Sequence, residues 1–109
     1  MYKRYLENYE EIERKVRYRL TINDLSSLTS SKLRIVRKTS QYAVVLCTFH
    51  KEKTASMFFY DNTTSFICYG CGTSGNYVSF FALMEGITYI EAVTRLARFY
   101  KIKMKWRKK

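Results

Sequence analysis

The chain is poor in residues that break regular structure or cross-link it covalently. Its 109 residues include no proline, four glycines, one histidine and three cysteines. An odd number of cysteines argues against a disulfide framework, which needs paired cysteines and an oxidising compartment. There is no apolar run of the length that a membrane span requires, and no internal repeat or low-complexity linker. We therefore expect one small, soluble, cytoplasmic domain that is not attached to a membrane.

All three cysteines and the single histidine fall into one spacing pattern. Two residues separate Cys47 from His50, two separate Cys68 from Cys71, and seventeen lie between the pairs. Each short pair can form a tight knuckle that presents two ligands on one side, and the intervening hairpin brings the two knuckles together. Three thiolates and one imidazole complete the tetrahedral coordination of a structural zinc ion and leave no position for a substrate. The pattern predicts one structural Zn²⁺, held by these four residues.

Besides a disulfide framework, a redox dithiol is the alternative to zinc for these cysteines. A redox dithiol of Cys68 and Cys71 would make His50 a bystander, but such a motif lies between a strand and a helix of a βαβ unit. It would also leave the third cysteine without a role. The neighbouring Gly70 and Gly72 favour a metal knuckle, because glycine permits the left-handed backbone that a knuckle often requires. Structural zinc contributes roughly 10–16 kcal/mol of apparent binding free energy in small modules, so it would supply much of the folding free energy.

Basic side chains outnumber acidic ones by 20 to 9, which gives a net charge of +11. The excess lies in two blocks, since residues 32–54 have a net charge of +5 and residues 101–109 of +6. Clustering of this kind is expected of a protein that binds nucleic acid. A basic tail can also serve only to keep a protein in solution, and that alternative stays open for residues 101–109.

The N-terminal residues 2–20 are predicted to form an amphipathic helix. Apolar residues recur there at helical spacing, and pairs of opposite charge four residues apart support the helix. The stripe consists of Tyr2, Tyr5, Leu6, Tyr9, Ile12, Val16 and Leu20. Such a stripe usually packs on its own domain and less often binds a partner protein.

The rest of the chain predicts a short helix, a set of strands and two further helices. The short helix and a polar turn fall within residues 21–32. Strands are predicted from β-branched and aromatic residues over 33–38, 42–46, 56–60 and 65–69. Of the two later helices, one is capped by Asn76 and ends at Gly86, and the other opens with a capping box at Thr88. The predicted fold class is α+β, a zinc-ribbon antiparallel β-sheet with flanking helices and an extra N-terminal amphipathic helix.

Alternation along the third strand separates its aromatic residues onto two faces. Met57 and Phe59 point to one face, and Phe58 and Tyr60 point to the other. One face must cover the helices, so the other would show aromatic rings near basic residues. Rings for stacking and cations for phosphates are what single-stranded nucleic acid needs. We predict contacts to it from Arg34, Arg37, Lys38, Lys51, Lys53, Phe58, Tyr60 and Tyr69. The assignment of these rings to the core stays open.

Three segments of the chain together resemble the zinc-binding domain of bacterial and phage DnaG-type DNA primases. They are LCTFHKEKTAS (residues 46–56), FICYGCG (66–72) and GNYVSF (75–80). The family pattern has a Cys-Pro-Phe-His knuckle, Glu-Lys-Thr-Pro-Ser, Cys-Phe-Gly-Cys-Gly, and then Gly-Asn or Gly-Asp before an apolar helix. The resemblance covers about residues 21–102. It implies a zinc-ribbon sheet with flanking helices, contact with single-stranded template, and a part in choosing where primer synthesis starts.

The chain also departs from the family pattern. Thr48 and Ala55 replace two family prolines, and residues 40–42 differ from the family's turn of glycine, a basic residue and asparagine. The family's catalytic fold needs a glutamate and clustered aspartates to hold magnesium, whereas Asp24 and Asp61 are the only aspartates here. Two-metal phosphoryl transfer requires such clustered carboxylates. We therefore expect that this chain is not a catalyst by itself but an accessory component of a DNA primase.

These features predict a stand-alone primase-type zinc module for DNA replication. It would bind single-stranded DNA template and support primer initiation in trans with a separate polymerase or helicase of a primosome, as would suit a phage or other mobile element. The expected division is an N-terminal helix (1–20), the zinc-binding domain (21–100) and a basic tail (101–109). The alternative is a zinc-ribbon adaptor or regulator that docks a partner protein through its N-terminal helix. A third possibility is a fragment of a longer primase.

Overall fold

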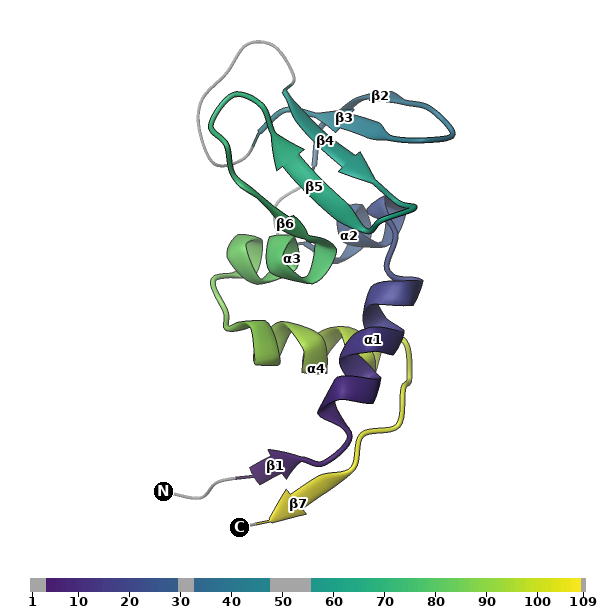
Figure 1. Ribbon diagram of the computed structural model, residues 1–109, viewed down its shortest axis with the longest axis vertical. Helices are drawn as coiled ribbons and strands as arrows, with labels where there is room; N and C mark the ends of the chain where they lie inside the picture. The colour runs from purple at the N-terminus through teal and green to yellow at the C-terminus, as the bar shows by residue number, and fades with distance from the viewer. Residues whose placement is uncertain (1–3, 30–32, 48–55, 109) are drawn as a thin grey trace.

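The computed structural model describes residues 4–29, 33–47 and 56–108. A β-sheet lies at one end of the molecule, a two-stranded ribbon at the other, and helices between them (Figure 1). The antiparallel sheet has the order β2-β3-β4-β5-β6, with β2 at Ile35–Lys38, β3 at Ala43–Val45, β4 at Met57–Tyr60, β5 at Ser65–Cys68 and β6 at Ser74–Asn76. The helices are α1 (Tyr9–Arg19), α2 (Ile22–Leu28), α3 (Tyr77–Glu85) and α4 (Tyr89–Phe99), and the ribbon pairs β1 (Arg4–Leu6) with β7 (Trp106–Lys108). None of the described helices is long and apolar enough to cross a membrane.

The α+β class and the antiparallel sheet are confirmed, and the four predicted strands occur within two residues of their expected bounds. The register pairs Met57 with Cys68 and Phe59 with Phe66, and these four side chains are buried on one face. Phe58 and Ile67, which pair on the opposite face, are only partly buried. β6 was not predicted, because a three-residue edge strand of Ser, Gly and Asn has no apolar alternation to reveal it.

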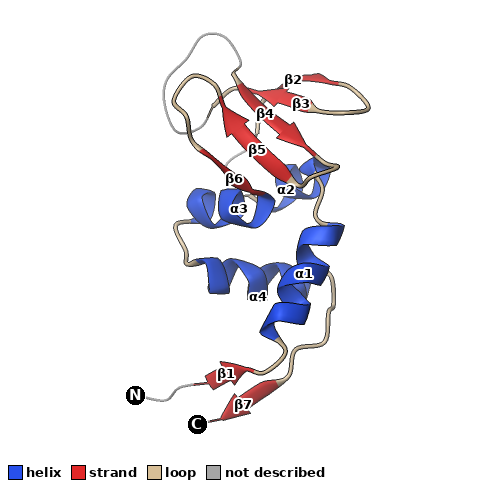
Figure 2. Ribbon diagram, in the orientation of Figure 1, coloured by secondary structure: helices blue, strands red, loops and turns tan. Residues whose placement is uncertain are grey.

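Helices α2 and α3 cover the buried face of the sheet (Figure 2). Thr21 caps α2 by accepting a hydrogen bond from the Asp24 amide at 3.2 Å, and Asn76 caps α3 by accepting one from the Ser79 amide at 2.8 Å. α3 ends at Gly86, whose φ of 67° lies in the left-handed region that suits glycine. The expected capping box at Thr88 opens α4. These local signals set the helix ends as the sequence predicts.

The apolar stripe of α1 packs into the protein's own core. Ile12 and Val16 are fully buried, and Leu20 is 1% exposed. They belong to one apolar cluster with Val93 and Leu96 of α4, the helix against which α1 lies. At these three positions the stripe is filled by this chain's own core, so they are not a free surface for a partner protein.

The predicted helix over residues 2–20 is wrong at its start. Residues 4–6 form β1, which pairs with residues 106–108 of β7, and α1 begins only at Tyr9. Asn8, just before α1, does not cap the helix with its side chain. It instead donates to the Lys103 carbonyl at 3.1 Å and accepts from the Lys105 amide at 2.9 Å. Residues 4–8 therefore bond the C-terminal segment instead of extending the helix. Residues 106–108 form β7, and residues 103 and 105 are bonded to Asn8, so this segment is not a free tail.

Candidate metal centre and nucleic-acid interface

Three cysteines converge at the end of the sheet. Cys47 follows β3, Cys68 is the last residue of β5, and Cys71 lies in the turn between β5 and β6. Their Sγ atoms all lie within 4.8 Å of one another, and those of Cys47 and Cys71 are 3.8 Å apart. Cys47 and Cys68 are buried, whereas Cys71 is exposed. All three thiols are thus in one place, which a redox pair of Cys68 and Cys71 would not require.

The sulfur geometry fits a tetrahedral zinc ion. Zinc–sulfur bonds of about 2.3 Å at tetrahedral angles separate two sulfurs by about 3.8 Å. This is the separation of the Cys47 and Cys71 Sγ atoms. The cluster therefore suits one structural zinc ion, with three thiolate ligands from these cysteines. The predicted fourth ligand, His50, lies outside the described residues.

The second knuckle is shaped by one glycine and two backbone hydrogen bonds. Gly72 has a φ of 81°, a left-handed conformation that strains residues with a side chain. Its amide donates to the Cys68 carbonyl at 2.8 Å, and the Cys68 amide donates to the Thr73 carbonyl at 2.8 Å. The turn is closed by these bonds, so Cys68 and Cys71 point into one site.

Two hydroxyl groups contact the sulfurs. The Ser56 Oγ lies 3.4 Å from the Cys68 Sγ, and the Thr73 Oγ1 lies 3.2 Å from the Cys71 Sγ. Hydrogen bonds from the Thr73 hydroxyl and amide, with smaller contributions from Cys68 and Cys47, lower the pKa of Cys71 to about 6. Such donors orient ligands and favour the thiolate form that binds metal. Sequence reasoning did not assign these hydroxyls. Thr73 is two residues from Cys71 along the chain, and Ser56 precedes Met57, which pairs with Cys68.

Aromatic rings form a continuous cluster on the face of the sheet opposite the helices. This aromatic platform consists of Tyr42, Phe58, Tyr60 and Tyr69. The Phe58 ring centroid lies 5.5 Å from that of Tyr42, 6.3 Å from that of Tyr60 and 5.3 Å from that of Tyr69. Tyr69 is 64% exposed. A hydrogen bond to Tyr69, followed by burial, raises the pKa of the Tyr60 hydroxyl.

The platform joins the three predicted rings and adds Tyr42, which sequence reasoning missed. Tyr42 precedes Ala43, and Ala43 pairs with Phe59 on the buried face. Alternation therefore turns Tyr42 to the outer face, beside Phe58. The signal that would have found it is the cross-strand register, which the sequence alone does not specify.

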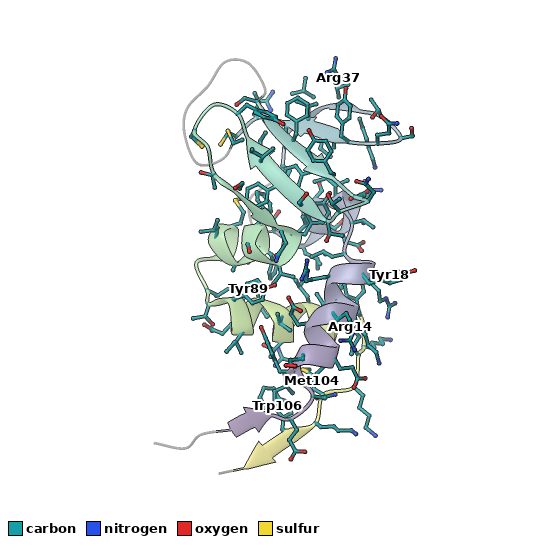
Figure 3. The ribbon with its side chains drawn as sticks, in the orientation of Figure 1. Arg14, Tyr18, Arg37, Tyr89, Met104 and Trp106 are labelled. Atoms are coloured by element: carbon teal, nitrogen blue, oxygen red, sulfur yellow. The ribbon has the colours of Figure 1, made fainter. Side chains whose placement is uncertain are left out.

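The predicted cations divide between the two faces. The Arg37 guanidinium lies 5.9 Å from the centroid of the Tyr42 ring, and Arg34 is exposed just before β2. Lys38 instead pairs with Ala43, whose side chain is on the buried face of the sheet. The Lys38 Nζ donates a hydrogen bond to Asn23 Oδ1 of α2 at 2.7 Å. Figure 3 shows Arg37 at the sheet end of the molecule. Lys51 and Lys53 lie outside the described residues.

Comparison with known proteins agrees with this geometry. The CHC2 zinc finger family matches residues 9–109. The DNA primase of Rickettsia prowazekii is 38% identical over 74% of this chain, and that of Thermotoga maritima is 36% identical over 82% of it. In both cases the matched region is only 14% of the primase's length. A solved structure of the Aquifex aeolicus primase, comprising its zinc-binding and RNA polymerase domains, superposes with a TM-score of 0.69 and 30% identity, over 86% of this chain and 22% of that one. The chain therefore belongs to the CHC2 zinc finger family of DnaG-type DNA primases.

Proposed function

We propose that this chain binds single-stranded DNA template through the aromatic platform and supports primer initiation with a polymerase or helicase acting in trans. The observation that carries this proposal is the platform itself, four contiguous rings on the face of the sheet opposite α2 and α3, with Arg37 beside them. It lies next to the metal centre, because Tyr69 directly follows Cys68.

A platform of this kind favours single strands over duplex. Every base has a face that can stack on an aromatic side chain, and each stacked base contributes roughly 1–3 kcal/mol. In a duplex those faces are covered by neighbouring bases, so the platform can reach only unpaired bases. Arg37 beside Tyr42 and the exposed Arg34 just before β2 supply positive charge for the phosphates.

We further propose that His50 completes the zinc site and that the site acts structurally. A bound zinc ion would cross-link the end of β3 to the β5–β6 turn through Cys47, Cys68 and Cys71. Tyr69 lies between two of these ligands, so its position depends on the knuckle. We assign phosphoryl transfer to a separate polymerase, since two-metal chemistry needs clustered carboxylates and the described residues cluster only cysteines as potential metal ligands.

The platform is tested by titrating a labelled oligonucleotide with zinc-loaded variants. Phe58→Ala removes the central ring and should weaken binding about 5- to 150-fold, the equivalent of one stacked base. Phe99→Ala is the matched control, because Phe99 is a 48% exposed ring on α4, outside the platform. Equal affinities of Phe58→Ala and wild type would refute the platform as the binding surface.

Salt dependence tests the cations. The logarithm of affinity for a single strand should fall with the logarithm of salt concentration, with a slope of roughly −0.7 per phosphate neutralised. Arg37→Gln should make the slope shallower by about one such increment, and Lys51→Ala with Lys53→Ala should act in the same direction without loss of zinc. An unchanged slope in both variants would remove these side chains from the interface.

A further inference from the structure

A groove on α1 combines cations with an aromatic ring, and none of its residues belongs to the aromatic platform. This α1 groove has a volume of about 340 Å³ and is lined by Arg14, Lys15, Tyr18, Arg19 and Ile102. Arg14 and Tyr18 lie on the same flank of the helix, well away from Arg37 on the sheet (Figure 3). Three cations thus surround an aromatic ring and an aliphatic side chain.

The side chains of the groove differ in how firmly they are held. Tyr18 is 88% exposed, on the opposite side of α1 from the buried stripe. The Arg19 guanidinium lies 4.8 Å from the centroid of the Tyr100 ring, which holds it in place. Lys15 pairs with Glu11 at 2.8 Å, whereas Arg14 makes no ion pair with any described residue. The groove therefore offers an open ring beside a guanidinium that makes no ion pair with a described residue.

An ordered row of lysines continues from the groove. Lys101, Lys103 and Lys105 are exposed, while the alternating Ile102 and Met104 pack against the core. The row is held at one end where the Ile102 amide donates to the Ala97 carbonyl at 2.9 Å, and at the other by Asn8. The row runs close to the helix, because Ile102 lines the α1 groove together with Arg14 and Lys15. Residues 101–109 contain no acidic side chain to offset it.

A long polyanion with planar apolar groups matches this surface better than a peptide does. The lysine row alternates regularly and suits a repeating negative charge, and the exposed Tyr18 ring suits a stacked base. An acidic peptide would use the cations but would need a deeper apolar pocket than an open groove to anchor a side chain. The molecule is 49 Å long, with the platform at the sheet end and the lysine row leading toward the ribbon (Figure 1).

We propose that the α1 groove and the lysine row form a second single-strand binding site, which holds a stretch of the same template outside the platform. The choice of ligand rests on the proposed function. A strand long enough to reach both sites would contact both, whereas a short one would occupy only the platform. The contributions of the two sites can therefore be distinguished by comparing oligonucleotides of different length.

The test measures affinities of the zinc-loaded full chain for labelled oligothymidylates of on the order of 6 and 24 nucleotides. Tyr18→Ala should weaken binding of the long strand at least about fivefold and leave the short strand unchanged. Arg14→Gln should also weaken only the long strand and make its salt slope shallower by roughly 0.7. Arg95→Gln is the matched control, because it removes the same charge from α4, where Arg95 pairs with Glu85. Unchanged denaturation midpoints would show that folding is intact.

The outcomes separate this inference from the proposed function. If the α1 variants bind both lengths as wild type does while Phe58→Ala weakens both, the inference is overturned and the platform stands. If Phe58→Ala changes neither length while the α1 variants weaken both, the groove is a single-strand site and the platform is not. If the α1 variants lose affinity only for a poly-glutamate probe, the groove binds acidic protein and the inference is overturned.

Discussion

One carboxylate connects the sheet to the two helices that cover it, and its removal should be costly. Asp61 lies in the turn between β4 and β5. Its Oδ1 accepts a hydrogen bond from the amide of Ile22, the first residue of α2, at 3.0 Å. It also accepts one from the hydroxyl of Tyr77, the first residue of α3, at 2.8 Å. Tyr77 is fully buried, and its burial and this hydrogen bond raise its pKa.

Asp61→Ala should lower the free energy of unfolding by about 2–4 kcal/mol. A hydrogen bond to a charged group contributes roughly 1.5–3 kcal/mol, and a buried hydroxyl left without a partner costs about 1–3 kcal/mol. The expected loss is smaller than the sum of these two contributions, because Asp61 is exposed and water can replace its carboxylate at the Ile22 amide. Asp61→Asn keeps an acceptor oxygen and should cost about 1 kcal/mol. Against a typical stability of about 5–15 kcal/mol, the alanine variant should be visibly weakened.

A double-mutant cycle with Tyr77→Phe isolates the buried bond. Tyr77→Phe removes the hydroxyl together with its need for a partner, so alone it should cost about 1 kcal/mol. Combined with Asp61→Ala it should cost less than the sum, with a coupling of about 1 kcal/mol. The measurement is urea denaturation followed by circular dichroism at one fixed free zinc concentration, because bound zinc adds to apparent stability. An alanine variant within about 0.5 kcal/mol of wild type, or strict additivity, would refute this account.

Three further predictions test the metal centre, the N-terminal helix and the C-terminal turn. Cys71→Ser should abolish stoichiometric zinc by elemental analysis and unfold the domain, because the metal contributes to folding outright; full thermal stability would contradict this. Burial and then the hydrogen bond to Glu13 raise the pKa of Tyr89 to about 12. The stability that Tyr89 adds over Tyr89→Phe, about 1 kcal/mol, should be constant below pH 10 and vanish as the pH rises to about 12, and a pH-independent difference would exclude it. Lys101 has a φ of 57°, so Lys101→Gly should stabilise the protein by up to about 1 kcal/mol in thermal denaturation, where a loss would argue against strain.

The cysteine cluster and the caps of α3 and α4 could be predicted because their signals are local. Four ligands at close spacing indicate a knuckle pair whatever the surrounding fold, and the structure brings Cys47, Cys68 and Cys71 together. Caps act within one turn, so Asn76 and Thr88 begin their helices where expected. The alternation of strand residues was equally accessible, because the pleat turns successive side chains to opposite faces.

What only the tertiary structure decided depends on contacts between residues far apart in the chain. The pairing register of β2, β3 and β4 determines which face of the sheet each side chain lies on. It places Tyr42 in the platform and directs Lys38 toward Asn23 of α2. The Asn8 side chain hydrogen-bonds to residues 103 and 105 and does not cap α1. Helix α1 therefore begins only at Tyr9, and the C-terminal segment is held beside it. Periodicity reports which residues share a face of one element, but it does not report which distant segment competes for their hydrogen bonds. The sequence by itself therefore determined the convergence of the three cysteines, the ends of α3, the start of α4 and the alternating strand faces. Long-range pairing decided the start of α1, the extent of the platform and the ribbon of β1 with β7.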